Sequence, residues 1–249
     1  MLFEQTIDKL NQMKLFGMVS ELERQLKTND ISLLSFEERF SLLVDVEATS
    51  RENRRLKRLL SNARLRENAC IEDIDFRADR GLDKGFILSL ANCSWIEKHL
   101  NAIIVGPTGV GKTFIACALG NAACRQGYST IYYRTPRLLN ELKMARADGS
   151  FVKLLNKLAK TDLLVIDDWG LTTLSDSERR DILEVVEDRY KVRSTIMASQ
   201  VPVDKWHDVV ANPTMADAIL DRIVHNAYKI NLRGGSMRKQ SAPLTDSGH

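Results

Sequence analysis

Eight residues near the middle of the chain have the types and the spacing that hold the phosphates of a nucleotide. They read Gly106-Pro107-Thr108-Gly109-Val110-Gly111-Lys112-Thr113, which fits the pattern G-x-x-x-x-G-K-T. The glycines let backbone N–H groups curve around a β-phosphate. Lys112 would reach the β- and γ-phosphates, and the Thr113 hydroxyl would be a ligand of Mg²⁺. The pattern therefore predicts a nucleotide-binding loop, and the alternative is a Gly-rich turn with a chance lysine.

Two carboxylates supply the second half of the predicted chemistry. The apolar run 163–166 is followed directly by Asp167 and Asp168. A continuous apolar run is typical of a strand buried on both faces, whose carboxyl end opens onto a phosphate site. We expect Asp167 to hold Mg²⁺, directly or through water, and Asp168 to orient or deprotonate the attacking water. The alternative is a buried strand that happens to end in acids at a surface turn.

The segments around these motifs indicate the elements that must position them. A short β-branched run precedes the phosphate loop, and an Ala-rich helix over 114–126 follows it and ends at Gly127. Strands are expected over 102–105, 128–133, 163–168, 195–200 and 227–232. Since helical patterns separate these strands, we predict an α/β fold with an open parallel five-stranded sheet flanked by helices. Its ligand would lie along the carboxyl edge of the strands.

The first 68 residues carry helical patterns and no strand pattern. Residues 1–27 are expected to form one amphipathic helix, with Leu15, Met18, Val19, Leu22 and Leu26 on a shared apolar face. A capping box of Ser35 and Glu38 predicts the start of a second helix. We therefore expect a small all-helical domain over 1–68, an ATPase domain over 69–240 and a disordered tail over 241–249.

A basic segment lies in the second half of this helical domain. Arg51, Arg54, Arg55 and Arg58 fall at helical spacing on one stripe, and Glu52 is the one acid between residues 51 and 66. Like charges at this spacing cost helix stability, so the stripe is easier to understand if a phosphate backbone neutralises it. The alternative is a solvated helix face. The candidate DNA contacts are Arg51, Arg54, Arg55, Lys57, Arg58, Arg64 and Arg66.

The overall composition bounds the class of protein. With 44% hydrophobic residues, 28% charged residues and a net charge of +3, the chain has the profile of a soluble globular protein. No apolar run is long enough to span a bilayer, and the N-terminus lacks a signal-peptide core, so no membrane partner is expected. The four cysteines lack metal-site spacing, and we expect them as core residues in a reducing cytoplasm.

Taken together, the phosphate loop and the strand ending in Asp167 and Asp168 resemble the Walker A and Walker B motifs of AAA+ ATPases. In that superfamily a polar sensor ends the next strand, at the position of Ser199 and Gln200 here. An arginine finger that reaches the neighbouring subunit would correspond to Arg222. The resemblance thus implies that Lys112, Asp168, Ser199, Gln200 and Arg222 serve ATP hydrolysis. On the residues alone, a local ion pair is the alternative role for Arg222.

Within AAA+ proteins the chain is most similar to the IstB transposition helper ATPases of insertion sequences. The resemblance is carried by Leu10-Asn11-Gln12-Met13-Lys14-Leu15-Phe16-Gly17-Met18, Ile166-Asp167-Asp168-Trp169-Gly170 and Gly234-Gly235-Ser236-Met237-Arg238-Lys239. It implies an ATP- and Mg²⁺-dependent protein that forms head-to-tail oligomers on double-stranded DNA, remodels that DNA and stimulates a transposase. DnaC-type helicase loaders share the core motifs, so loading of a replicative helicase is the alternative function. A small-molecule kinase and a nucleotide switch are further alternatives.

Two features depart from the general AAA+ pattern. Asp168 stands where most members carry glutamate, which is one methylene longer, so slow or partner-triggered hydrolysis is expected. The chain also stops shortly after the last predicted strand, so we expect no full C-terminal lid domain. Arg238 would therefore contact the nucleotide, DNA or the adjacent subunit, and these three roles stay open.

Overall fold

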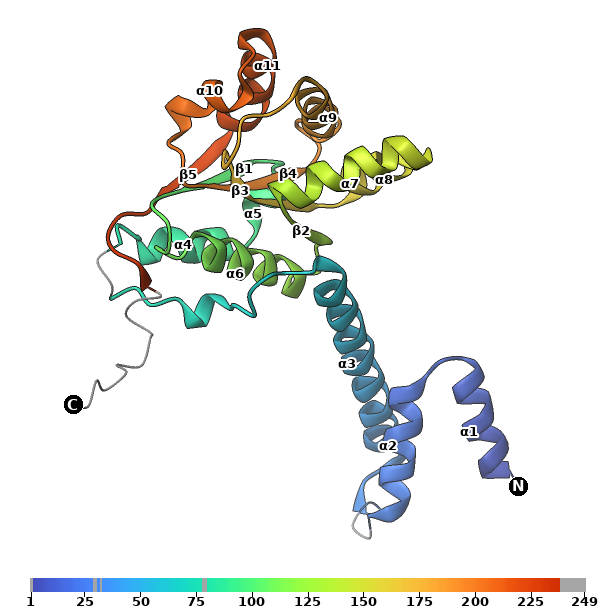
Figure 1. Cartoon of the computed structure of the whole chain (residues 1–249). Helices are drawn as coiled ribbons and strands as arrows, with labels where there is room; N and C mark the ends of the chain where they lie inside the picture. The colour runs from blue at the N-terminus through green and yellow to red at the C-terminus, as the bar shows by residue number, and fades with distance from the viewer. Residues whose placement is uncertain (1, 29–30, 32, 78–79, 238–249) are drawn as a thin grey trace, which may run out of the picture. The chain divides into compact units, whose positions relative to one another are not determined.

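The computed structural model describes residues 2–28, 31, 33–77 and 80–237 (Figure 1). The chain divides into two compact units, Met1–Arg58 and Leu59–His249, to both of which the long helix α3 (Phe36–Ala63) contributes residues. Among the described residues, no helix is both long enough and apolar enough to cross a bilayer. The predicted domain boundary at residue 68 stays a prediction, and the predicted tail 241–249 lies outside the described residues.

The first unit begins with two helices where the sequence predicted one. Helix α1 (Leu2–Gln12) ends before Lys14, whose φ of 60° lies in the left-handed region, and α2 (Phe16–Lys27) starts anew. The start of α2 is stabilised by a residue thirty positions further along the chain. The Glu47 carboxylate accepts hydrogen bonds from the N–H groups of Gly17 (2.7 Å) and Met18 (3.3 Å). A carboxylate at a helix N-terminus satisfies free N–H groups and stabilises a start there.

The buried face of α2 is polar, which the apolar periodicity did not predict. Gly17, Glu21 and Gln25 are buried, whereas Leu26 is 59% exposed. Glu21 accepts hydrogen bonds from Arg24 Nε (2.6 Å) and Gln25 Nε2 (3.1 Å), so the buried carboxylate is neutralised locally. Hydrogen bonds between charged and polar side chains therefore help to hold the first unit together, and such bonds require a specific geometry.

Replacing Gly17 with alanine is expected to destabilise this unit. A Cβ atom at Gly17 would lie 2.6 Å from the Glu47 Cα and 2.8 Å from the Val46 carbonyl oxygen, so the backbone must shift. We expect a loss of about 1–3 kcal/mol in the free energy of unfolding. Denaturant unfolding of the full chain, followed by circular dichroism, measures it. Gly235→Ala is the control, since its Cβ would meet nothing within 4 Å; equal stability of the two variants would contradict the expectation.

The second unit is built on a parallel sheet of five strands in the order β2-β3-β4-β1-β5. The strands are β1 (Asn101–Val105), β2 (Thr130–Arg134), β3 (Leu163–Trp169), β4 (Ser194–Ser199) and β5 (Ala227–Asn231). β3 and β4 are almost wholly buried, as expected of continuous apolar runs that lie between two layers of helices. The predicted parallel five-stranded sheet is confirmed.

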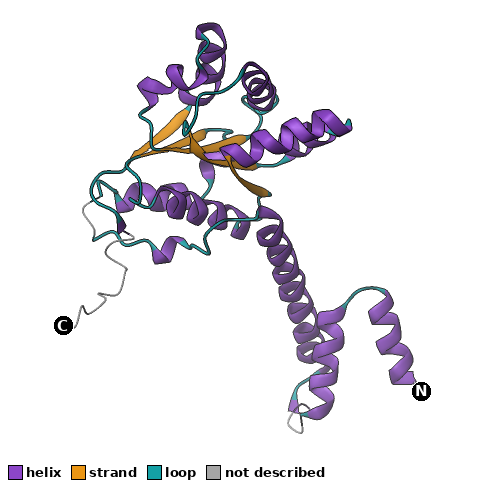
Figure 2. Cartoon of the chain, in the orientation of Figure 1, coloured by secondary structure: helices purple, strands orange, loops and turns teal. Residues whose placement is uncertain are grey.

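Helices cover both faces of this sheet (Figure 2). One face packs against α4 (Lys84–Ala91), α5 (Ser94–Glu97) and α6 (Lys112–Arg125), with the short η2 (Ile71–Asp73) beside them. The other packs against α7 (Thr135–Asp148), α8 (Phe151–Lys160), α9 (Asp176–Glu187), α10 (Trp206–Val210) and α11 (Pro213–Val224), with η3 (Val203–Lys205) before α10.

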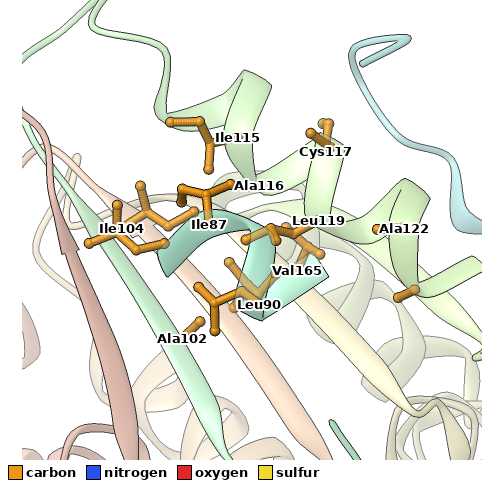
Figure 3. Packing of buried hydrophobic residues seen from close by; sticks show 14 of the residues in the cluster. Ile87, Leu90, Ala102, Ile104, Ile115, Ala116, Cys117, Leu119, Ala122 and Val165 are labelled. Carbon is orange, nitrogen blue, oxygen red and sulfur yellow. The ribbon is translucent and has the colours of Figure 1, made fainter. Parts of the chain in front are cut away.

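The two cores follow the alternation of side chains along each strand. Ala102, Ile104 and Val165 belong to the core that also contains Leu90 of α4 and Leu119 of α6 (Figure 3), whereas Ile103 belongs to the opposite core. The α6 helix is buried along nearly its whole length by this packing. Its amino end, which follows the phosphate loop, is thereby fixed at the carboxyl edge of the sheet.

Candidate functional site

The predicted phosphate loop connects the end of β1 to the start of α6. Gly109 (φ 84°) and Gly111 (φ 103°) adopt left-handed conformations that side chains disfavour, and Gly111 is the N-cap of α6. Gly106 is required for a different reason, since a Cβ atom there would lie 2.7 Å from the Leu232 carbonyl oxygen. The loop therefore curves tightly over a helix N-terminus, an arrangement that attracts phosphate.

Both functional side chains of the loop are held in place. Lys112 Nζ donates to the carbonyl oxygens of Gly106 and Pro107, at 2.8 Å each, which fixes its ammonium group at the loop. The Thr113 hydroxyl donates to Asp167 Oδ2 at 2.7 Å. The structure thus brings together the two motifs that the sequence predicted to cooperate.

Asp167 is fully buried and accepts hydrogen bonds on both carboxylate oxygens. Its Oδ2 receives the hydroxyls of Thr113 and Tyr132, each at 2.7 Å, and its Oδ1 receives the N–H of Asp168 at 2.8 Å. Burial raises the pKa of the Tyr132 phenol above its usual value, and the hydrogen bond with the Asp167 carboxylate raises this pKa further. The hydroxyl therefore stays a donor. Sequence reasoning missed Tyr132.

Asp168 turns away from the regular strand. Its φ of 59° accompanies an irregularity in the pairing of β3 with β4, which aims its carboxylate toward the loop cavity. Arg134 Nε, at the end of the neighbouring β2, donates to Asp168 Oδ2 at 2.6 Å, and Arg66 Nη1 lies 3.8 Å from the same oxygen. The predicted base is therefore paired with two arginines that sequence analysis did not connect to it.

The polar pair that ends β4 separates into two different positions. The buried Ser199 hydroxyl donates to the Trp169 carbonyl oxygen at 2.7 Å and accepts from the Val201 N–H, so it fastens the end of the strand. Gln200 instead accepts a hydrogen bond from the Thr108 hydroxyl at 2.7 Å. The Gln200 side chain therefore contacts the phosphate loop, whereas Ser199 contacts it through its backbone, since its carbonyl oxygen accepts a hydrogen bond from the Gly106 N–H at 3.2 Å.

These groups surround a cavity of about 690 Å³ at the carboxyl edge of the sheet. Of the residues that the sequence predicted for this site, Thr108, Gly109, Gly111, Lys112, Thr113, Asp168 and Gln200 line the cavity. The other lining residues are Arg66, Glu67, Asp73, Asp75, Arg80, Phe114, Arg134, Leu171 and Met237. The chain after β5 returns to this cavity, where the Met237 N–H donates to the Gly109 carbonyl oxygen at 3.0 Å. Arg238 lies outside the described residues.

Thr113, which lines the cavity, and its buried hydrogen-bond partner Asp167 fit Mg²⁺. A hydroxyl (Thr113) and a carboxylate (Asp167) are hard oxygen ligands, and Mg²⁺ takes few protein ligands because it keeps water and shares the substrate's phosphates. Within the described part of the chain, no group of three or more His, Cys, Asp or Glu side chains could hold a metal alone. The Thr113 hydroxyl and the Asp167 carboxylate thus suit a cation whose other ligands are water and the phosphates of a nucleotide.

Arg222 lies near the amino edge of the sheet, away from the loop. The side chain of Asn101, the first residue of β1, donates to the Arg222 carbonyl oxygen at 3.2 Å, whereas the loop follows the other end of that strand. The Arg222 guanidinium forms an ion pair with Glu187 and lies 5.7 Å from the centre of the Tyr190 ring. The local ion pair is therefore present, and Arg222 does not line the cavity of its own chain.

The basic segment of α3 is less repulsive than its sequence suggested. Arg51 Nε and Arg54 Nη2 both donate to Glu47 Oε1, at 2.7 and 3.2 Å, so two arginines of the stripe share an acid that precedes it. Arg55, Lys57 and Arg58 are exposed. Arg51 and Arg54 of the stripe are thus paired, and the predicted DNA contact Arg66 follows the end of α3 and lines the loop cavity.

Comparison with known proteins gives a consistent picture. Residues 8–244 match the family model described as IstB-like ATP binding protein. The chain is 46% identical, over 96% of its length and 98% of the relative's, to a putative insertion sequence ATP-binding protein of Sinorhizobium fredii. It is 49% identical, over 81% of its length and 88% of the relative's, to a putative ATP-binding protein of insertion sequence IS1162 from Pseudomonas fluorescens.

A solved structure supports the fold. The DnaC helicase loader aligns with a TM-score of 0.54 and 23% identity over 66% of this chain and 97% of that chain. About two thirds of the chain therefore share the fold of the DnaC helicase loader, which agrees with the predicted fold class.

Proposed function

The chain belongs to the family of IstB-like ATP-binding proteins, and from this premise we propose that it is an ATPase that assembles on duplex DNA and stimulates a transposase. The observation that carries the proposal is the convergence of Lys112, Thr113 and Asp167 on one phosphate loop. The names of the relatives connect this nucleotide chemistry with insertion sequences, which favours transposition over the loading of a replicative helicase.

Each residue of the cavity has a role in this proposal. Backbone N–H groups of the loop and the Lys112 ammonium bind the phosphates. Thr113 and Asp167 would hold Mg²⁺, which would supply positive charge against the charge of the phosphates. Asp168 orients the attacking water. Gln200 holds the phosphate loop in place through its hydrogen bond with Thr108. Because Arg134 holds the Asp168 carboxylate at 2.6 Å, hydrolysis requires that this pair rearrange, so basal turnover is slow.

Arg222 provides the link between copies. Its place near the amino edge of the sheet leaves it outside its own cavity, so it would act in the cavity of the next subunit in a head-to-tail assembly. There it would exchange its ion pair with Glu187 for a phosphate oxygen. Assembly would therefore depend on bound nucleotide, because the Arg222 of the neighbouring copy has a phosphate oxygen to contact only when ATP fills the site.

The basic residues of α3 are proposed to contact the DNA backbone. We expect the combined variant Arg55→Ala, Lys57→Ala and Arg58→Ala to bind duplex DNA about tenfold or more weakly, with a salt slope smaller by about three, because each lost phosphate contact removes roughly one unit. Fluorescence anisotropy with a labelled duplex at several salt concentrations measures both quantities.

A basic helix on the other unit provides the matched control. Lys153, Lys157 and Lys160 are exposed on α8, and their replacement by alanine removes the same charge. This control variant is expected to retain most of the affinity and the salt slope. Equal losses in the two variants would mean that only net charge matters, and an unchanged affinity of the α3 variant would contradict its proposed role.

The function itself is tested by strand transfer with the transposase of the same insertion sequence. We expect insertion into target DNA to increase when the wild-type chain and ATP are both present, and ATP turnover to increase with duplex DNA. Tight binding to a replicative helicase, without an effect on the transposase, would instead support the alternative of a helicase loader.

A further inference from the structure

Two adjacent tyrosines of β2 make matching hydrogen bonds on opposite faces of the sheet. The Tyr132 hydroxyl donates to Asp167 Oδ2 and the Tyr133 hydroxyl donates to Glu141 Oε2, both at 2.7 Å. Both rings are buried, with exposed fractions of 7% and 2%. Tyr132 belongs to the core beside α6 and Tyr133 to the opposite core. Only one of two similar residues therefore reaches the candidate metal site.

The register of the sheet explains how Tyr132 reaches a residue on the next strand. β2 pairs with β3 so that Tyr132 lies opposite Val165 and Arg134 lies opposite Asp167. Tyr132 and Asp167 are therefore diagonal neighbours on one face, and the hydrogen bond of 2.7 Å shows that the aromatic side chain spans their separation. A phenylalanine would fill the same space without a donor, so the hydroxyl serves the carboxylate and not the packing.

The two donors on Asp167 Oδ2 differ in what else they do. The Thr113 hydroxyl belongs to the phosphate loop and is itself a candidate ligand of the cation, whereas the Tyr132 hydroxyl is carried by a ring anchored in the core. Groups that hold a metal ligand from behind fix its orientation and influence metal affinity. Tyr132 is in the position of such a group.

We propose that Tyr132 is a positioning residue for the divalent cation, which holds the Asp167 carboxylate in the orientation that binds Mg²⁺ with the nucleotide. This inference rests on the proposed ATP- and Mg²⁺-binding function. It predicts that loss of the hydroxyl weakens the affinity for Mg²⁺ and leaves nucleotide binding without Mg²⁺ nearly unchanged. A hydrogen bond that only stabilised the core would lower stability and leave the Mg²⁺ dependence unchanged.

The test uses the full chain with Tyr132→Phe, and Tyr133→Phe as the matched control. Binding of a fluorescent ATP analogue is titrated with Mg²⁺, and the affinity for the analogue is measured separately in EDTA. For Tyr132→Phe we expect the Mg²⁺ midpoint to rise about tenfold, while the affinity in EDTA stays within about twofold of wild type. Tyr133→Phe is expected to change neither quantity, although it removes a hydrogen bond of the same length, which is part-buried.

Two further measurements keep the outcomes distinct. Thermal unfolding of both variants shows whether they fold equally well. In the Asp167→Asn background, Tyr132→Phe is expected to cause no additional shift of the midpoint, since the carboxylate that it holds is already altered. A Mg²⁺ midpoint within about twofold of wild type, or an equal shift in Tyr133→Phe, would overturn the role of Tyr132. Wild-type protein that bound the analogue without any dependence on Mg²⁺ would overturn the proposed Mg²⁺ site as well.

Discussion

Replacement of Lys112 by alanine is expected to abolish ATP binding at ordinary concentrations and leave the fold intact. The ammonium group donates to the carbonyl oxygens of Gly106 and Pro107, so it already lies at the loop where β- and γ-phosphates would bind. Charge-assisted hydrogen bonds contribute about 1.5–3 kcal/mol each, and loss of one or two weakens binding by about 100-fold or more. Calorimetric titration with ATP measures the loss.

A lysine elsewhere on the same unit separates this effect from a general change of charge. Lys153 is exposed on α8 and lines no part of the loop cavity. Lys153→Ala removes the same positive charge, and its affinity for ATP is expected to equal that of wild type. If Lys112→Ala bound ATP as tightly as this control, the loop would not be the nucleotide site.

Replacement of Arg222 by alanine is expected to lower ATP turnover in the assembled state by about 100-fold or more and leave ATP binding to a single chain unchanged. The reason is geometric, because Arg222 lies near the end of β1 that is opposite to the phosphate loop. Phosphate release in the presence of duplex DNA measures turnover. Normal turnover in this variant would mean that the ion pair with Glu187 is the whole role of Arg222.

Mixing of variants tells whether Arg222 acts between subunits. A Lys112→Ala chain binds no nucleotide but still presents its own Arg222, so it is expected to restore part of the turnover of Arg222→Ala chains. Asp168→Asn provides the comparison within a subunit, since Asp168 lines the cavity of its own chain. Its turnover is expected to stay low in the same mixture. Equal restoration of both variants would contradict the assignment of Arg222 to the neighbour.

The sequence predicted the parts of the site that are contiguous along the chain. The phosphate loop and the acids after the apolar run appear as local patterns, because each needs only the residues of one element to be recognised. Apolar runs also predicted the central strands, since a parallel strand that is buried on both faces is mainly apolar. The sheet and the meeting of Thr113 with Asp167 followed from these patterns.

The contacts that sequence analysis missed all depend on how separate elements align. Tyr132 meets Asp167 only because β2 and β3 pair in one register, and Arg134 meets Asp168 through an irregularity of β3. A pattern along one strand contains no information on that alignment. Apolar periodicity in turn reports which residues can be buried, so it does not reveal the polar face of α2 that packs around Gly17.

Arg189 illustrates the same limit within the core. Its guanidinium is buried and donates to the carbonyl oxygens of Leu158, Thr161 and Ser194 near the amino ends of β3 and β4. Burial lowers the pKa of Arg189 to about 9. In the sequence this residue looks like an ordinary charge after a helix. Arg189 Nε also donates to the Thr195 hydroxyl at 3.1 Å. Most of its partners are carbonyl groups, which every residue carries, so a pattern of side chains could not predict them.

The mass of the particles that the full chain forms with duplex DNA tests the central claim most directly. Light scattering after size exclusion would be carried out with ATP, with ADP and without nucleotide, at moderate ionic strength. The proposed function predicts particles of several copies bound to DNA with ATP, and smaller species under the other two conditions and with Lys112→Ala. Monomers or dimers of unchanged mass under all three conditions, with DNA eluting separately, would contradict it.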